Sequence, residues 1–359
     1  MKRNHLIIIA AVAGVVVLFA GYRLVFSKNQ MEIMAVTGAT PLAVKQDVKS
    51  GTTLEVSGLT KRVYKFGADA LNAFAPTYIR TREVAPDGKF MGTYRYSGIP
   101  VLHILEGVAV KKPDNAAFDR PLDMIVTFEN AAGERVHFSY GELTMTADAN
   151  PVILAFDRKE LVPSKPKKDE PYKWNAHREN IKGLRLVCPA EPDTARYLDD
   201  VRSVHLNDVT VDNSLLPAMK KGEKCAASSL TVIAGGKAKP VRLVGVERAA
   251  VKGWVRTGHG QGYKGISDAE GYNLASLLAK NFPGCGPKNF FLFVACDGYR
   301  SIFSGTEVFK TLDGRGMMLV EKLDGKKPAG GYTLGPVNDY YVDRDIWGLS
   351  HIMLIEEIK

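Results

Sequence analysis

The stretch Gly98-Ile-Pro-Val-Leu-His-Ile-Leu105 recurs in a loose form as Gly271-Tyr-Asn-Leu-Ala-Ser-Leu-Leu278, at an offset of 173 residues. Three further pairs of segments follow in the same order, at offsets of 165, 165 and 148 residues: 138–143 with 303–308, 153–156 with 318–321, and 201–206 with 349–354. Loop insertions and deletions between two copies of one structural unit produce offsets that drift in this way. The shared order therefore predicts that the body of the chain is a tandem repeat.

The repeat divides the chain into a first unit over residues 52–206 and a second unit over residues 229–359. Between them, residues 207–228 contain asparagine, aspartate, proline and the run Lys220-Lys-Gly-Glu-Lys224, a composition typical of a polar connector. Residues 29–51 are predicted to be a linker that precedes the first unit.

Sequence patterns predict more strands than helices. Alternation and β-branched residues predict strands at 53–56, 124–128, 135–138, 152–156, 184–187 and 201–206. Leu71 and Phe74 share one face of a short predicted helix over 68–74, and Pro100 suits the first turn of another over 100–107. The predicted fold class is α+β: a strand-rich mixed domain with short helices, present twice.

Composition excludes several classes of protein. The 359 residues are 45% hydrophobic and 24% charged, which is ordinary for a globular protein and excludes a mainly disordered chain or a multi-span membrane protein. The formal net charge of +9 is spread along the chain rather than gathered in one basic arm. We therefore predict no binding to nucleic acid.

The N-terminus predicts the compartment. Lys2 and Arg3 precede an uncharged apolar run over 6–20, and no clear small-residue cleavage site follows it. This pattern favours an uncleaved signal anchor over residues 1–28, with a cleaved signal peptide as the alternative. The basic flank stays in the cytoplasm, so we expect a single-pass protein of the cell membrane whose bulk is periplasmic.

Export would place the four cysteines where disulfides persist. Their spacing contains no C-x-x-C motif, which argues against a zinc ribbon and covalent haem. Cys188 and Cys296 each follow an apolar run and are expected to be buried thiols. Cys225 and Cys285 lie in loop-like sequence and could form one disulfide, although sequence alone does not pair them.

Several of these segments resemble the molybdopterin-binding domain of the sulfite oxidase group. The strings Leu54-Glu-Val-Ser-Gly-Leu59 and Tyr96-Ser-Gly-Ile-Pro-Val-Leu-His-Ile-Leu105 are similar to motifs of that domain. Residues 294–308 resemble its later D-G-Y and F-S-x-x-E-[LV] motifs, whereas 138–143 keep only the second motif. The resemblance covers most of 52–206 and, more loosely, 229–357. It implies the molybdopterin-domain fold of the sulfite oxidase group in each unit.

The resemblance also implies a molybdenum site that this chain does not complete. Enzymes of the group bind molybdenum through a pterin dithiolene and a cysteine thiolate, which lies between the first helix and the Y-x-G-[IV]-P segment. Residues 78–94 and the corresponding residues 253–268 contain no cysteine. The sequence therefore predicts a pseudo-enzyme with no metal ligand and no cofactor. Molybdopterin held with atypical metal ligation is the alternative.

Five residues are candidates for ligand binding. Alternation places Arg80 and Arg82 on one strand face, where two guanidinium groups could hold a phosphate or a carboxylate. Arg256, His259 and Tyr263 lie in a glycine-rich stretch, where the backbone could approach a ligand and His259 could bind an anion or a metal. The alternatives are a solvated basic strand face and a flexible glycine loop. No nucleophile with an activating neighbour is recognisable, so no catalytic residue is predicted.

Three other motifs have plain structural interpretations. Asp297-Gly-Tyr299 predicts a turn. Residues 331–347 are rich in aromatic and acidic residues and are interpreted as an ordinary structured loop. The alternatives are a protein-contact surface and a calcium site at Asp339, Asp343 and Asp345, although their spacing is not that of an EF-hand. The lysine- and proline-rich run over 165–171 is predicted to be an exposed loop.

These observations favour one function and leave one alternative. The favoured function is a membrane-anchored, extracytoplasmic binding or scaffold subunit with degenerate molybdopterin-domain-like units. Its expected partners are the membrane and a protein of an envelope or redox complex. The alternative is an enzyme, a molybdopterin-dependent oxidoreductase with atypical metal ligation. The sequence identifies neither the ligand nor the oligomeric state.

Overall fold

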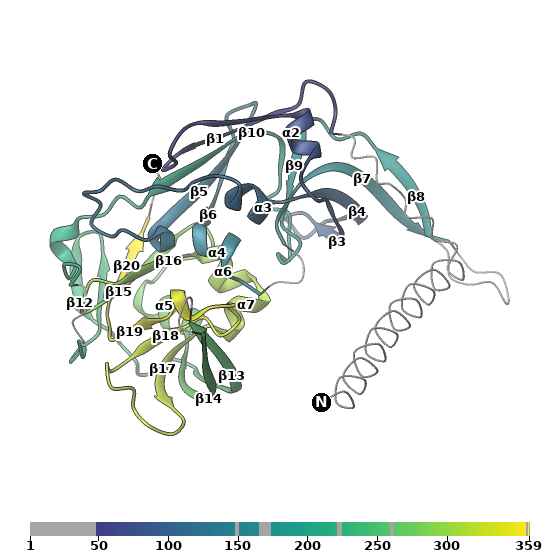
Figure 1. Ribbon diagram of the computed structural model, residues 1–359. Coiled ribbons are helices and arrows are strands. Elements are labelled where there is room, and N and C mark those ends of the chain that lie inside the picture. The colour runs from purple at the N-terminus through teal and green to yellow at the C-terminus, as the bar shows by residue number, and fades with distance from the viewer. Residues whose placement is uncertain are drawn as a thin grey trace, which may run out of the picture. The chain divides into compact units, whose positions relative to one another are not determined.

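The repeated stretch forms the same strand-to-helix junction in both halves of the computed structural model, which describes residues 48–147, 151–164, 174–220, 225–258, 262–356 and 358. β4 (Phe90–Pro100) leads into α3 (Val101–Glu106), and β14 (Gly262–Asn273) leads into α5 (Leu274–Asn281) (Figure 1). Helix α3 buries its apolar residues Val101, Ile104 and Leu105, and Val108 just after the helix is buried as well.

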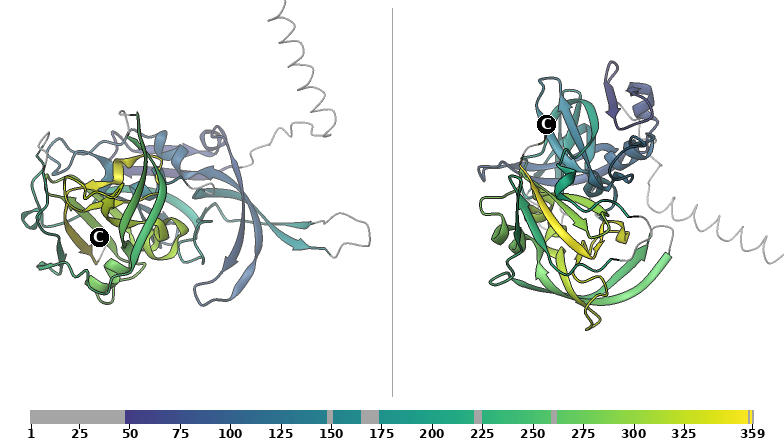
Figure 2. Two further views of the ribbon diagram at one scale, coloured as in Figure 1. Left: turned by 90° about the horizontal axis from the view of Figure 1, so that it is seen from below. Right: turned by 90° about the vertical axis from the view of Figure 1, so that its left-hand side faces the viewer.

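The described strands of the first half form one ten-stranded sheet, whose longest path runs β2-β1-β10-β9-β7-β4-β3. Besides β4, its strands are β1 (Thr53–Gly58), β2 (Tyr64–Gly67), β3 (Thr77–Val84), β5 (Met124–Asn130), β6 (Arg135–Ser139), β7 (Ile153–Pro163), β8 (Trp174–Glu179), β9 (Leu184–Val187) and β10 (Leu198–Asp208). The six predicted strands of this half are confirmed. The β7–β8 hairpin extends away from the rest of the sheet (Figure 2). The short helices are α2 (Ala68–Asn72), η1 (Pro121–Asp123) and α4 (Tyr140–Thr144).

The described strands of the second half form two five-stranded sheets. One contains β11 (Thr231–Ala234), β12 (Lys237–Pro240), β15 (Phe290–Ala295), β16 (Arg300–Ser304) and β20 (Leu349–Ile355). The other contains β13 (Arg248–Gly258), β14, β17 (Met318–Leu323), β18 (Thr333–Gly335) and β19 (Ile346–Trp347). The remaining helices are η2 (Asn213–Leu215), α6 (Gly305–Lys310), α7 (Leu312–Gly316) and η3 (Val342–Arg344). Strand-rich mixed sheets with few helices make the fold α+β, as expected.

Strand pairing confirms the repeat. β1 pairs in parallel with β10, as β11 does with β20, and β10 then pairs with β5 as β20 does with β15. β3–β4–β7 and β13–β14–β17 are likewise matching antiparallel runs. The registers also agree with the sequence offsets, because Gly98 faces Ala155 and Gly271 faces Val320. The two halves are therefore copies of one topology.

The glycine that opens each copy of the repeated stretch lets a neighbouring strand approach closely. A Cβ atom on Gly98 would lie 2.7 Å from the carbonyl oxygen of Leu154, and one on Gly271 would lie 1.9 Å from that of Leu319. Backbone atoms of a paired strand cannot move aside without opening the sheet. This explains why both copies keep glycine at this position.

We expect Gly271→Ala to lower the free energy of unfolding by about 1–3 kcal/mol, because the added methyl overpacks a buried sheet. Urea unfolding followed by circular dichroism measures the effect. Gly67→Ala is the matched control, since nothing lies within 4 Å of its added Cβ atom. Equal stability of the Gly271 and Gly67 variants would show that the sheet tolerates the methyl group.

A large hydrophobic cluster lies in each half, and a further cluster joins the two halves. The first-half cluster includes Leu54 and Phe138, and the second-half cluster includes Phe293 and Phe303. A third cluster joins the halves, because Ile125 of β5 packs with residues of β15, β16 and β20. Val209, Leu215 and Leu216 of the predicted connector also pack there. Residues 47–359 accordingly form one compact unit, and the predicted domain boundaries stay predictions.

The cysteine prediction requires a correction. Cys225 forms a disulfide with Cys296, whereas Cys285 is free and half-buried. Cys296 was expected to be a buried thiol because it follows the apolar strand β15. That strand ends at Ala295, so Cys296 enters the following turn, where its amide donates to the carbonyl of Gly348. Cys188 is buried and unpaired, as expected.

Some predictions fall outside the described residues. These are the signal anchor over 1–28, most of the linker over 29–51, and the loop over 165–171. In the part of the chain that the structure describes, no helix has the length and apolar character needed to cross a membrane.

Candidate functional site

A cleft of about 390 Å³ lies between the two halves. Helices α3 and α4 and the segment after β9 line it from the first half, and α6, α7 and Tyr340 line it from the second. Much of the wall is apolar, with Pro76, Pro100, Leu102 and Val152 among the lining residues. The volume lies within the range of small-molecule pockets, about 300–1,000 Å³.

The charged wall of the cleft is built on Arg196. Its guanidinium group makes an ion pair with Glu142, and its Nε donates to Glu191 at 2.8 Å. It also donates to the backbone carbonyl of His137 at 3.2 Å and lies 3.9 Å from the ring centre of Phe138. These contacts use the hydrogen-bonding groups of the guanidinium, so Arg196 links Glu142, Glu191 and the backbone at His137 into one wall.

The second half contains the same arrangement around Arg344, which is fully buried. Its guanidinium donates to Glu307 at 2.6 Å and to both carboxylate oxygens of Asp339, each at 2.6 Å. It also lies 4.5 Å from the ring centre of Phe303. Both copies thus place one arginine between two acids and over one phenylalanine ring.

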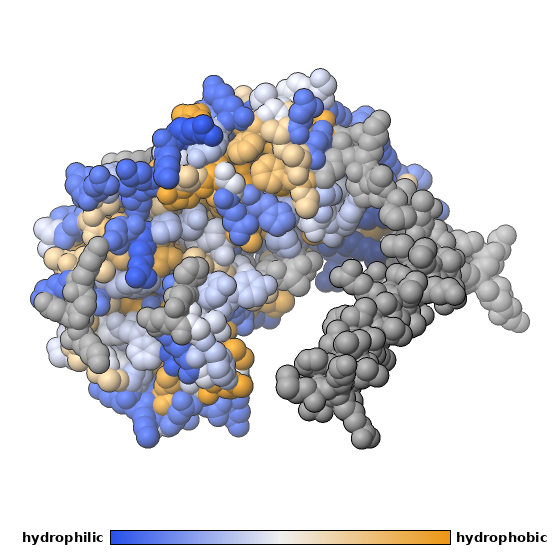
Figure 3. Space-filling model, in the orientation of Figure 1, coloured by the Kyte–Doolittle hydropathy of each residue, from blue (hydrophilic) through white to orange (hydrophobic). Residues whose placement is uncertain are grey.

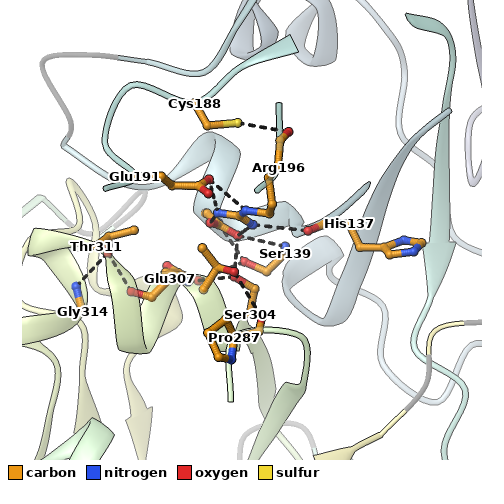
Figure 4. Close-up of polar contacts among 12 residues, drawn as sticks. His137, Ser139, Cys188, Glu191, Arg196, Pro287, Ser304, Glu307, Thr311 and Gly314 are labelled. Atoms are coloured by element: carbon orange, nitrogen blue, oxygen red, sulfur yellow. Dashed lines mark hydrogen bonds and ion pairs between the residues drawn. The ribbon is translucent and has the colours of Figure 1, made fainter. Parts of the chain in front are cut away.

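Reciprocal serine hydrogen bonds join the two arrangements. Ser139 caps α4 by accepting from the amide of Glu142, and its hydroxyl donates to Glu307 of the other half at 3.2 Å. Ser304 caps α6 by accepting from the amide of Glu307, and its hydroxyl donates to Glu142 at 2.8 Å. Figure 4 shows Ser139, Ser304 and Glu307 converging below Arg196. The two helix caps therefore also form a polar contact between the halves.

Charge balance in this network explains its shifted pKa values. Four carboxylates face two guanidinium groups, and burial adds a further penalty for ionisation. Burial raises the pKa values of Glu307, Glu191 and Asp339 above the ordinary range, although the neighbouring arginines oppose the shift. The same acids raise the pKa values of Arg196 and Arg344, which stay charged. The two arginines supply the positive charge that this network of acids faces.

Cys188 is a buried thiol on the wall of the cleft. It is 1% exposed, and its Sγ donates to the backbone carbonyl of Arg196 at 3.6 Å. Burial raises the pKa of this thiol well above its usual range, and the nearby Glu191 and Glu142 add to the shift. A thiolate is therefore disfavoured here, whereas molybdenum ligation requires one.

None of the four predicted site residues that the structure describes lines the cleft. Arg80 and Arg82 lie on the same exposed face of β3, so the alternation prediction is right, but neither lines the cleft. Arg256 is buried, with its guanidinium 5.2 Å from the ring centre of Trp254 and 4.8 Å from that of Trp347. Tyr263 is exposed on β14, and His259 lies outside the described residues.

Exposed hydrophobic residues accompany Tyr263 on the β13–β14 hairpin. Val255 and Ile266 are 56% and 61% exposed, and Figure 3 shows hydrophobic residues at the surface of this hairpin. The glycine-rich stretch is thus part of two paired strands rather than a free loop, except where it lies outside the described residues.

One of the three aspartates of the calcium alternative is already engaged. Asp339 is bound by Arg344, which occupies its carboxylate. Within the described ranges, no group of three or more histidine, cysteine, aspartate or glutamate residues has an arrangement that could hold a metal ion. The predicted turn at Asp297-Gly-Tyr299 is confirmed, with Gly298 at a φ of 83°.

Sequence reasoning missed the charge network, although the signals were present. The two F-S-x-x-E strings contain both capping serines and both bridging glutamates. An acid also precedes an arginine by five positions in each half, at Glu191 and Arg196 and again at Asp339 and Arg344. Aligning the halves on these two spacings would have found the network.

Comparison with known proteins assigns no family to this chain. No family model and no curated protein matches the sequence. Among solved structures, a chain of the sulfane dehydrogenase SoxCD from Paracoccus pantotrophus is similar, with a TM-score of 0.32 and 13% sequence identity. The match covers 86% of this chain and 79% of that chain. A TM-score this low assigns neither fold nor function, so the function is argued from the cleft.

Proposed function

We propose that this chain is a binding or scaffold subunit whose cleft between two degenerate molybdopterin-domain-like units accepts a small, mainly apolar ligand. The N-terminal anchor holds it to the membrane, with its bulk outside the cytoplasm, where it serves an envelope or redox complex. It does not use molybdenum chemistry.

One observation carries the proposal: three of the carboxylates that line the cleft are engaged by arginines. Glu142 and Glu191 are bound to Arg196, and Glu307 is bound to Arg344. A general acid or base must be able to exchange a proton with a substrate. Carboxylates held in buried ion pairs are suited to structural support, so the apolar wall remains for recognition.

The residues present do not fit the molybdenum centre that the sequence resemblance implies. That centre needs a cysteine thiolate, which favours soft metals. Residues 78–94 and 253–268, where the resemblance implies this ligand, contain no cysteine. This disagreement supports the pseudo-enzyme proposal over the alternative of a molybdopterin-dependent oxidoreductase.

The extracytoplasmic location rests on two features. The basic residues and apolar run at the N-terminus have the order of a signal anchor. The disulfide between Cys225 and Cys296 suits a compartment where disulfides persist.

Filling the cleft tests the proposed binding. The neutral dye N-phenyl-1-naphthylamine serves as the apolar probe, with its fluorescence followed during titration of the full chain. Leu102 is half-buried on α3 and lines the cleft, so Leu102→Trp should weaken dye binding by about tenfold or more. The matched control is Val162→Trp, on the exposed part of β7, which should bind the dye as the wild type does.

Circular dichroism spectra of both variants establish that they fold. Saturable binding that is lost only in the Leu102 variant supports the proposal. Absence of dye binding to the wild type, or equal binding by the two variants, would contradict it.

A further inference from the structure

A second cavity, of about 290 Å³, lies away from the cleft and shares no lining residue with it. It is bounded by Lys264 of the β13–β14 hairpin, by the turn that contains Asp297 and Tyr299, and by the segment from Val342 to Trp347. Arg120 of the first half closes one side.

Asp345 is the unusual group in this cavity. The residue is 2% exposed, and among the described residues neither of its carboxylate oxygens accepts a hydrogen bond. Burial raises its pKa well above the usual range, and the cation that most opposes this shift is Arg256, whose Nε also has no hydrogen-bond partner within those residues. A buried carboxylate without a donor is costly, so native proteins rarely keep one without a role.

The other lining groups favour a cationic ligand. Three carboxylates line the cavity, those of Asp297, Asp343 and Asp345, against the two positive groups of Arg120 and Lys264. Arg120 donates to the hydroxyl of Tyr299 at 3.3 Å and lies 5.1 Å from the centre of that ring. The cavity therefore has an unsatisfied buried acceptor, Asp345, beside two further carboxylates.

Aromatic rings complete the site. Tyr299 lines it and is fixed, since its hydroxyl donates to the carbonyl of Asp343 at 2.6 Å. Trp347, which is 40% exposed, lines it near the surface. Aromatic faces attract organic cations, more strongly where water is excluded.

We propose that this cavity binds a small organic cation, an alkylammonium or alkylguanidinium group, whose N–H groups donate to Asp345 beside Tyr299 and Trp347. The N–H groups of the ligand provide the hydrogen bonds that no described protein group donates to the carboxylate of Asp345. The site is independent of the apolar cleft, and so is its test.

Isothermal titration of the full chain with agmatine, which carries both a guanidinium and an ammonium group, tests the proposal. We expect saturable binding at one site in the wild type and a loss of affinity of about tenfold or more in Asp345→Asn. Glu270→Gln removes an exposed carboxylate from β14 outside the cavity, so it should bind agmatine as the wild type does. Tetramethylammonium has no N–H donor and should bind much more weakly.

Stability provides a second readout. Agmatine should raise the Tm of the wild type by about 2 °C or more and leave that of Asp345→Asn unchanged, because a ligand stabilises the folded state that binds it. A rise in the wild type that is absent from the variant supports the proposal. No agmatine binding to the wild type, equal binding by Asp345→Asn, equal binding of tetramethylammonium, or an equal rise in Tm in both proteins would each overturn it.

Discussion

Replacing Arg344 by methionine should lower the free energy of unfolding by about 3–5 kcal/mol. Arg344 has no exposed surface, and its guanidinium is the ion-pair partner of both Glu307 and Asp339. Methionine fills much of the space but leaves two buried carboxylates without their counter-charge. Urea unfolding of the full chain, followed by far-ultraviolet circular dichroism, measures the loss.

The matched control is Arg248→Met. Arg248 makes an ion pair with Glu321 at 2.9 Å, but its side chain is 51% exposed, so its loss should cost less than about 1 kcal/mol. Adding Glu307→Gln to the Arg344 variant should restore part of the stability, because one uncompensated charge is removed. An Arg344 variant as stable as the Arg248 variant would contradict the role given to the network.

The network also predicts a direction for pH dependence. Burial raises the pKa of Glu307 in the folded state above its value in the unfolded chain. A raised carboxyl pKa contributes stability at acid pH, and that contribution is lost as the pH rises through the folded-state pKa. The penalty in the Arg344 variant should therefore shrink as the pH falls, because a protonated Glu307 no longer needs the guanidinium.

Removing the disulfide with the double substitution Cys225→Ser and Cys296→Ser should cost about 4 kcal/mol. The bond closes a loop across a sequence separation of 71 residues, and a long closed loop restricts the unfolded chain strongly. It ties the segment before β11 to the turn after β15. Urea unfolding of the wild type with and without a thiol reductant should give the same difference as the double variant.

Cys285→Ser is the control for that experiment. This cysteine is half-buried and free, so its replacement should change stability by less than the disulfide substitution does. A double variant as stable as the wild type, or a larger loss in Cys285→Ser, would contradict the stabilising role given to the disulfide between Cys225 and Cys296.

Local pattern was enough to predict much of the fold. Strand positions followed from alternation, and the repeat followed from segment order, since both copies build the same strand pairs. The helix after Gly98 followed from Pro100 and the spacing of apolar residues. These features depend on residues close together in the chain, and the spacing of such residues can be read directly from the sequence.

The functional geometry depends on contacts between distant segments. The pairing of Cys225 with Cys296 required knowing that β15 ends in a turn beside Gly348. The link from Ser139 to Glu307 crosses 168 residues and joins the two halves. Hydrophobic period and composition carry no information about such pairs.

The candidate arginines illustrate the same limit. The shared strand face of Arg80 and Arg82 was predictable, but whether a cavity forms beside it was not. Arg256 was chosen for its glycine-rich surroundings, whereas its place between Trp254 and Trp347 follows from the packing of β13 against the segment at β19. Asp345 became a candidate only because the structure shows no hydrogen-bond donor to its buried carboxylate among the described residues.

We propose that this chain binds a ligand without molybdenum chemistry. Elemental analysis together with pterin fluorescence, on full-length protein purified from the membranes of its own host, is the sharpest test. We expect neither molybdenum nor tungsten in proportion to the protein, and no pterin. Stoichiometric metal with pterin would contradict it and establish the alternative, a molybdopterin-dependent oxidoreductase with atypical ligation.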